Sequence, residues 1–513
     1  MDAGVDSLFM DEVFGAYGQF EGYDDASMGG FRAWLMRKYC EGKGWKPDDE
    51  RWRTEFKAPL ENKAVCPDGT MKTFNYRECL IAADLASAPM EKDNPLRQEW
   101  GYGGQFLEDD TYCGYRHDRA WKHVYDKIHE YAAKKGREIS VDANGLNHHV
   151  DFQVAGFGKD WVGPKEEVQT TASFVRKYRA TVERGNELAG RPVPTTFFHD
   201  WGFGGFPFKE LKEEEQVKWI RVYAPEVYAA GGYYVFPVQL AGDWLLSVIK
   251  AHAEFYQAHK QWFHGGEWLG TRNVVCSVKG LTTVTWQFPA RKQRVVHIIN
   301  HNYANRQIAP QRDVEVRVPS SKRPISVTCA SPGFREDKPV PFDWGDGQAK
   351  VRLDQIDAYV CLALTYEELP SDYFGKDVAT VNTTGFWAQP KVSEFTLGPD
   401  GKINEPGQLC YIVQGNLHPD LRNNPTFIVD YPRDGQFTVH VNSVASVGAK
   451  LLIYLDDKLA SEVDLPDTDK QNNSNAGEYD QDLTIPVPAG HHKIRVDNTG
   501  GDWFSVDFYE FIR

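Results

Sequence analysis

The chain has 513 residues, of which 41% are hydrophobic and 26% are charged, and its formal net charge is −15. This length exceeds a single hydrophobic core and predicts about three domains, and the composition is that of an ordinary globular protein. The acidic charge argues against nucleic acid as a partner, because a phosphate-binding surface needs clustered Lys and Arg. No apolar run approaches the roughly 18 residues of a membrane span, so we expect no membrane insertion.

Aromatic residues make up 13% of the chain, with 15 Trp and 24 Tyr, and many lie in glycine-rich segments. Aromatic rings stack on the apolar face of a sugar ring, so this composition favours a carbohydrate partner, although large proteins also bury many aromatic side chains. The eight Cys residues show no CxxC or Cys/His spacing. We therefore expect no metal site, no dense disulfide scaffold and no cofactor.

Strand and helix patterns alternate through the first half of the chain. In chain order they are a strand at 5–13, helices at 31–39 and 117–136, strands at 139–141 and 150–154, a helix at 166–189, a strand at 194–198, a helix at 209–230 that breaks near Pro225, a strand at 233–238 and a helix at 244–260. This alternation, with carboxylates at the strand ends, is typical of a TIM barrel.

Only about five strands are present where a closed barrel needs eight. We therefore predict that residues 1–268 form a partial (β/α) TIM-type barrel of about five β/α units whose N-terminal part is missing. The stretch 41–116 shows no clean period and predicts a long loop or an inserted subdomain. The alternative is an open, doubly wound sheet of five strands.

The period changes to two from about Val274 onward. Alternating apolar residues predict antiparallel strands, and these strands form two β-sandwich domains at 270–366 and 384–513, joined by a less regular connector at 367–383. Cys329 and Cys361 lie in such strands, and we expect both to be buried free thiols. The predicted architecture is thus a partial barrel followed by two antiparallel sandwiches.

Several segments resemble known carbohydrate-active proteins. GVDSLFMDE, AAGGYYVFP and VVHIINHNY resemble the barrel and appended sandwich of bacterial glycoside hydrolases of the clan A-like or dextranase-like kind. AGHHKIRVDNTGGDWFSVDFYEF resembles the carbohydrate-binding-type domains that follow many of them. The resemblance implies a secreted or periplasmic enzyme whose signal peptide was lost with the missing N-terminus, and a carbohydrate substrate.

The resemblance also implies catalytic residues. In clan A barrels the acid/base follows the fourth strand and the nucleophile follows the seventh, which places Glu12 and Asp200 in these roles. Asp11 stands where an Asn is usual, and Asp200 where a Glu is usual. One alternative is therefore that Asp11 is the nucleophile, as in dextranase-like barrels. Another is that Asp11 and Glu12 only cap or salt-bridge the barrel rim.

Further polar and aromatic residues follow other predicted strands. We expect these candidates to bind substrate through hydrogen bonds or ring stacking, rather than to hold a metal: Asp142, Asn144, His148, His199, Trp201 and Trp503. His149 accompanies His148, and loop aromatics such as Trp100 and Tyr112 are either stacking platforms or packing.

The predicted function is a glycoside hydrolase or transglycosidase acting on a poly- or oligosaccharide through paired carboxylates. The alternative is a noncatalytic carbohydrate-binding or scaffolding protein built on a degenerate barrel. Because the first three strand ends are missing, we expect this chain alone to be a poor catalyst.

Overall fold

The computed structural model describes residues 7–10, 23–83, 94–101, 111–143, 145–157, 172–199, 211–235, 243–271, 274–370, 378–383, 392–470, 472–474 and 477–513. The chain forms two compact units. Unit 1 is Met1–Ala155 with Arg184–Thr195, and unit 2 is Gly156–Glu183 with Thr196–Arg513. Within the described ranges, every helix is too short or too polar to cross a membrane.

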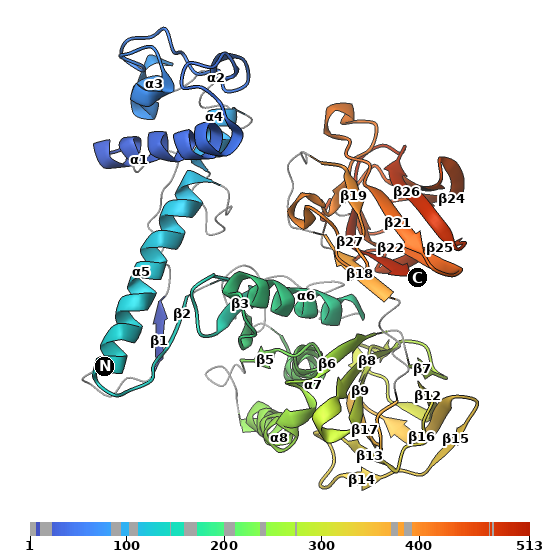
Figure 1. Ribbon diagram of the computed structural model, residues 1–513. Coiled ribbons are helices and arrows are strands. Elements are labelled where there is room, and N and C mark those ends of the chain that lie inside the picture. The colour runs from blue at the N-terminus through green and yellow to red at the C-terminus, as the bar shows by residue number, and fades with distance from the viewer. Residues whose placement is uncertain are drawn as a thin grey trace. The chain divides into compact units, whose positions relative to one another are not determined.

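A helical subdomain occupies the first part of unit 1 (Figure 1). Its elements are α1 (Asp25–Leu35), the π-helix η1 (Met36–Glu41), α2 (Arg51–Thr54), the 3-10 turn η2 (Met71–Thr73), α3 (Tyr76–Ala82), α4 (Pro95–Trp100) and α5 (Tyr112–Lys134). Side chains of Asp24, Asn75, Asn94 and Thr111 cap helix N-termini by accepting backbone N–H bonds. The described residues of the stretch 41–116 thus contain short helices, and the choice between a long loop and an inserted subdomain for the whole stretch remains a prediction.

The core of this subdomain is aromatic. Phe31, Tyr76, Trp100 and Tyr112 are buried and contact one another edge-on or tilted, with the Phe31 and Trp100 ring centroids 5.1 Å apart. Trp100 is 1% exposed and Tyr112 is 3% exposed. Of the two alternatives for these rings, the structure shows packing, because burying large rings stabilises a subdomain built from short helices.

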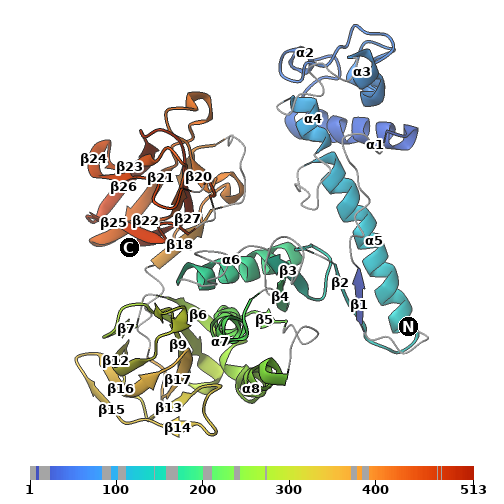
Figure 2. The same cartoon turned by 180° about the vertical axis from the view of Figure 1, so that it is seen from behind.

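The long helix α5 leads into a pair of parallel strands, β1 (Ser7–Met10) and β2 (Ser140–Ala143). Figures 1 and 2 show α5 running beside both strands. Trp121 on α5 packs with Val141 of β2, and Leu8 of β1 joins the same cluster. A helix beside a parallel strand pair is an arrangement common to barrels and open α/β sheets.

A separate small sheet has the order β3-β4-β5, in which β4 and β5 pair in parallel. Its strands, and the helices near them in sequence, are β3 (Gln153–Phe157), α6 (Ala172–Ala189), β4 (Thr195–His199), α7 (Glu213–Ala229), β5 (Tyr233–Tyr234) and α8 (Asp243–His259). β3 begins three residues later than predicted at 150. Among the described residues before the first sandwich, the strands form these two small sheets and no closed barrel is shown, so the partial barrel remains a proposal.

The predicted break at Pro225 is wrong, because α7 runs from Glu213 to Ala229 without interruption. A proline inside a helix removes a hydrogen bond and costs about 3 kcal/mol. The turns around Pro225 are buried almost completely, among them Ile220, Tyr223 and Val227 at 0% exposure. Burial of this hydrophobic surface offsets the cost and keeps the helix intact.

The first β-sandwich has a four-stranded sheet of order β15-β16-β12-β7 and a six-stranded sheet of order β14-β13-β17-β9-β8-β6. The strands are β6 (Glu267–Gly270), β7 (Val275–Cys276), β8 (Leu281–Phe288), β9 (Gln293–Asn300), β12 (Gln311–Pro319), β13 (Ser326–Ala330), β14 (Lys338–Pro339), β15 (Phe342–Gly345), β16 (Gln348–Ile356) and β17 (Tyr359–Thr365), with a small hairpin of β10 (Tyr303–Ala304) and β11 (Gln307–Ile308). The paired strands of both sheets are antiparallel, as predicted, and Cys329 and Cys361 are buried free thiols.

The second β-sandwich encloses its own core, centred on residues such as Phe427, Phe437 and Tyr509. Its sheets have the orders β18-β27-β22-β25, with β20 on β27, and β19-β21-β26-β23-β24. The strands are β18 (Val378–Asn382), β19 (Glu394–Thr396), β20 (Ile412–Val413), β21 (Thr426–Tyr431), β22 (Gly435–Val444), β23 (Ala449–Leu455), β24 (Lys458–Leu465), β25 (Gln481–Val487), β26 (Gly490–Asn498) and β27 (Phe504–Ile512).

Two features of this sandwich differ from the sequence prediction. β18 lies in the predicted connector but pairs with β27, so this sandwich begins before residue 384. β19 pairs in parallel with β21, while the other pairs are antiparallel. Both strands are short, and a short edge strand carries too few residues for its period to be read.

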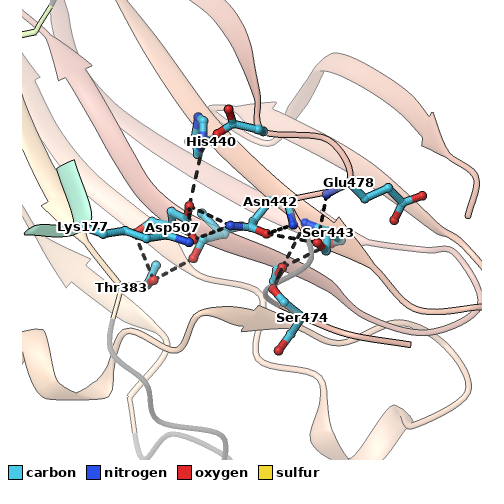
Figure 3. A network of polar contacts seen from close by, with 12 residues as sticks. Lys177, Thr383, His440, Asn442, Ser443, Ser474, Glu478 and Asp507 are labelled. Carbon is cyan, nitrogen blue, oxygen red and sulfur yellow. Dashed lines mark hydrogen bonds and ion pairs between the residues drawn. The ribbon is translucent and has the colours of Figure 1, made fainter. Parts of the chain in front are cut away.

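A buried polar network lies on the outer face of β22 and β27 (Figure 3). His440 is 2% exposed, and its ring nitrogens lie 2.8 Å from Asp482 and 3.1 Å from Asp480. Asp507 accepts bonds from Asn442 and lies 3.5 Å from Lys177 of α6. Burial lowers the pKa of His440, but the hydrogen bonds to the two carboxylates outweigh this effect and raise the pKa above its ordinary value of 6.5.

We expect this sandwich to lose stability as the pH rises above 6.5. A raised histidine pKa contributes stability that is fully present below the unfolded-state pKa and lost as the pH passes through the folded-state pKa. Once the intrinsic rise of amide exchange with pH is divided out, the protection of the β22 amides in the whole chain should therefore fall across this pH range. The same pH series on His440→Gln should show no such change, and an identical response in both proteins would contradict the prediction.

Candidate functional site

The most unusual carboxyl group among the described residues is that of Asp142. Asp142 lies near the C-terminal end of β2. In the register of the two strands it is paired with Phe9 of β1, and the next pair is Ala143 with Met10. β1 and β2 therefore end at the same edge. The C-terminal edge of parallel strands is where barrel and open-sheet enzymes build their sites.

Asp142 is 1% exposed, and within the described part of the chain neither side-chain oxygen has a hydrogen-bond partner. Burial raises the pKa of this carboxyl to about 6, and the negative charge of Asp151 acts in the same direction. A buried acid without partners destabilises a protein, so its presence at a strand end is typical of a functional group.

Asp151 lies nearby and shows the opposite behaviour. Its carboxylate accepts hydrogen bonds from the Val141 backbone N–H at 2.8 Å and the Tyr125 hydroxyl at 2.8 Å, and it contacts His129 and Arg191. These partners hold the loop after β2 against α5. Asp151 is therefore a structural carboxylate. The carboxyl of Asp142, in contrast, has no hydrogen-bond partner among the described residues.

Several predicted site residues lie outside the described residues: Asp11, Glu12, Asn144, Asp200 and Trp201. In the sequence, Asp11 and Glu12 follow β1 directly and Asn144 follows β2. His199 is the last residue of β4, and its side chain is also outside the described set. Their roles, and the pairing of Glu12 with Asp200, remain predictions.

The two histidines after β2 make separate contacts. His148 Nδ1 lies 2.9 Å from the carbonyl oxygen of Leu188, and His149 Nε2 lies 2.8 Å from the Asp118 carboxylate. The His149 carbonyl accepts a bond from the Trp121 indole at 2.7 Å. These contacts tie the loop to α5 and α6, and substrate binding by His148 remains a prediction.

Trp503 lies far along the chain, in the second sandwich. It is 5% exposed and packs with Ile412 and Ala445 in a small cluster beside the main core. A ring buried to this extent presents little surface for stacking on a sugar, so its role as a binding platform also remains a prediction.

Sequence reasoning missed a cavity of about 330 Å³ in unit 2, between α8 and the first sandwich. It is lined by Val248, His252, Phe334, Asp357 and Tyr359, among others. His252 is 4% exposed, its Nδ1 has no hydrogen-bond partner among the described residues, and burial together with Arg221 lowers its pKa to about 3. No local signal marks this site, because its walls come from segments far apart in the sequence.

Comparison with known proteins gives no family assignment. No family model and no curated protein matches the chain. Among solved structures, it is similar to an isomalto-dextranase from Arthrobacter globiformis bound to panose, with 11% identity, 100% of this chain and 90% of that chain covered, and a TM-score of 0.27. It is also similar to a β-porphyranase of glycoside hydrolase family 86 from Bacteroides plebeius, with 11% identity, coverage of 77% and 74%, and a TM-score of 0.30.

A third similar structure is a cycloisomaltooligosaccharide glucanotransferase from Paenibacillus, with 13% identity, coverage of 29% of this chain and 27% of that chain, and a TM-score of 0.25. This chain thus spans about a quarter of that protein, and only 16% of the α-L-fucosidase that is also similar. These structural neighbours are carbohydrate-active enzymes. TM-scores of 0.25 to 0.30 show only a distant likeness, from which no activity of this chain follows.

Proposed function

We propose that this chain is a glycoside hydrolase that acts on a poly- or oligosaccharide through carboxyl groups at the ends of β1 and β2. The observation that supports it is the buried, unpartnered carboxyl of Asp142, whose pKa is raised to about 6. Asp11 and Glu12 follow the neighbouring strand in the sequence. Glycoside hydrolysis requires two carboxyl groups on opposite sides of the scissile bond, one protonated and one ionised.

In this proposal Asp142 acts as the general acid and donates its proton to the glycosidic oxygen as the bond to the anomeric carbon breaks. Asp11 or Glu12 then attacks the anomeric carbon or activates a water molecule, and Asp200 remains a third candidate. The raised pKa of Asp142 keeps it protonated at mildly acidic pH, whereas an ordinary aspartate would already be ionised. This role extends our prediction from the sequence, which assigned Asp142 to substrate binding.

The test is a screen for hydrolysis of a glycan panel by protein expressed from the complete reading frame. On any glycan that is cleaved, Asp11→Asn, Glu12→Gln and Asp200→Asn are compared with the unaltered protein. We expect one of the three to lower the rate by at least about 100-fold, and azide to restore turnover if that residue is the nucleophile. Cleavage that survives all three substitutions would contradict the proposal.

A noncatalytic carbohydrate-binding function is the second candidate. The cavity between α8 and the first sandwich favours it, since its volume of about 330 Å³ and its apolar walls with a neutral His252 suit a small uncharged ligand. Sugar binding that is lost in Ser247→Trp, which fills the mouth of this cavity, but retained in the neighbouring exposed variant Leu246→Trp would support it. Such binding without any hydrolysis would favour this candidate over the enzyme.

A further inference from the structure

A pocket of about 330 Å³ on the helical subdomain gathers three arginine side chains. Arg37 comes from η1, and Arg116 and Arg119 come from the first turns of α5. The guanidinium carbons of Arg37 and Arg119 lie 5.3 Å and 5.5 Å from the centre of the Tyr115 ring. Two guanidinium groups therefore lie near the same Tyr115 ring in the lining of this pocket.

Two of these arginines donate hydrogen bonds to hydroxyl oxygens. Arg119 Nη1 donates to the Tyr115 hydroxyl at 2.6 Å, and Arg116 Nη1 donates to Ser27 Oγ at 2.8 Å. Among the described residues, Arg37 and Arg119 have no ion pair with a carboxylate, and both are exposed. Their charges are thus directed at the pocket without compensation.

Other arginines of the same subdomain are paired with carboxylates. Arg51 lies 2.8 Å from Asp49 and Arg53 lies 2.7 Å from Glu50, and Arg51 also stacks on a Trp ring at 4.3 Å. The chain has 73 acidic and 58 basic residues, so carboxylates are abundant. The like charges of Arg37 and Arg119 repel one another, and two guanidinium groups placed in this way favour an oxyanion, which they bind by parallel N–H bonds.

We propose that this pocket binds the sulfate ester or carboxylate groups of an acidic polysaccharide. The side chains of Arg37 and Arg119 supply the donors, Arg116 adds positive charge beside them, and the Tyr115 ring with the exposed Ala33 contacts the sugar. The inference that the oxyanion belongs to a polysaccharide rests on the proposed function. The inference that the pocket binds an oxyanion rests on the positions of the arginine side chains alone. A net charge of −15 repels polyanions elsewhere on the chain, so their binding requires a local basic site.

Affinity electrophoresis and calorimetry of the full chain with dextran, dextran sulfate and polygalacturonate test this proposal. We expect binding to at least one of the two acidic polymers, no binding to dextran, and weakening by added NaCl. The double variant Arg37→Gln/Arg119→Gln should raise the Kd by about 10- to 100-fold, the loss expected for charge-assisted hydrogen bonds. The matched control Arg51→Gln/Arg53→Gln makes the same change of charge in the same subdomain and should bind like the unaltered chain.

Unchanged binding by the pocket variant, or equal losses in both double variants, would overturn the proposal. An unchanged melting temperature, expected because both side chains are exposed, shows that the variant is folded. Sodium sulfate is tested as a competitor of the acidic polymer. If it displaces the polymer completely at the same concentration of sulfate groups, the pocket binds a free anion and the assignment to a polysaccharide is wrong. Binding needs no turnover, so Asp142→Asn should still bind, which separates failure of this proposal from failure of the proposed catalysis.

Discussion

Asp142→Asn should lower the rate of glycan hydrolysis by about 100- to 10,000-fold, the usual contribution of a positioned general acid or base. The amide has nearly the same shape as the acid but cannot give up a proton. Because the pKa of Asp142 is raised to about 6, the rate of the unaltered enzyme should fall as the pH rises above this value, and the variant should lose that part of the profile. Initial rates between pH 4 and pH 8 measure both effects.

The same substitution should stabilise unit 1 at neutral pH. As the pH rises from the ordinary aspartate pKa of 3.8 to about 6, the unfolded chain ionises before the folded one, and the free energy of unfolding falls. The penalty amounts to about 3 kcal/mol, and the amide does not carry it. Variant and unaltered protein should therefore melt alike near pH 4, and the variant should melt higher at pH 7.

Asp151→Asn is the matched control, because it makes the same change close to Asp142. It removes charge from a carboxylate with partners on every side, so we expect it to destabilise unit 1 at pH 7. A variant of Asp142 that is as active as the unaltered enzyme would remove this residue from catalysis. Equal melting of the Asp142 variant and the unaltered protein at pH 7 would show that burial does not raise the pKa of the Asp142 carboxyl.

Glu226→Ala should destabilise the packing of α7 on the first sandwich by about 3–5 kcal/mol. Glu226 is 0% exposed, and its carboxylate lies 2.6 Å from Nε2 of His301, whose Nδ1 lies 2.7 Å from the Thr282 hydroxyl. Removing the carboxylate leaves the other buried polar groups without their partner. Hydrogen–deuterium exchange of the α7 amides should become markedly faster, and Glu226→Gln should retain much of the protection because it keeps a hydrogen-bonding oxygen.

An exposed ion pair at the same packing surface provides the control. Arg221 of α7 lies 3.3 Å from Asp357 of the sandwich, and both side chains are well exposed. Exposed pairs contribute about 0–1 kcal/mol, so Asp357→Asn should change the exchange of α7 very little. If both substitutions had the same effect, burial of the Glu226–His301 pair would not be what fastens α7 to the sandwich.

The sequence by itself determined the features that depend on local periodicity. Alternation in residues such as Val284, Trp286 and Phe288 predicted the antiparallel strands, and the helical period around Trp121 predicted α5. The strand ending at Asp142 was also predicted, because a short apolar run followed by polar residues is a local pattern. The carboxyl of Asp142 was thus a candidate before its surroundings were known.

Only the tertiary structure decided which residues act together. Pro225 stays helical because distant residues bury its helix, and the raised pKa of Asp142 arises from burial that no local pattern reports. Arg37 and Arg116 are far apart in the sequence and meet because the aromatic core packs α1 and η1 against the start of α5. Periodicity identifies the face of an element that is buried, but the partner of that face, and the charges that meet there, are set by packing over long range.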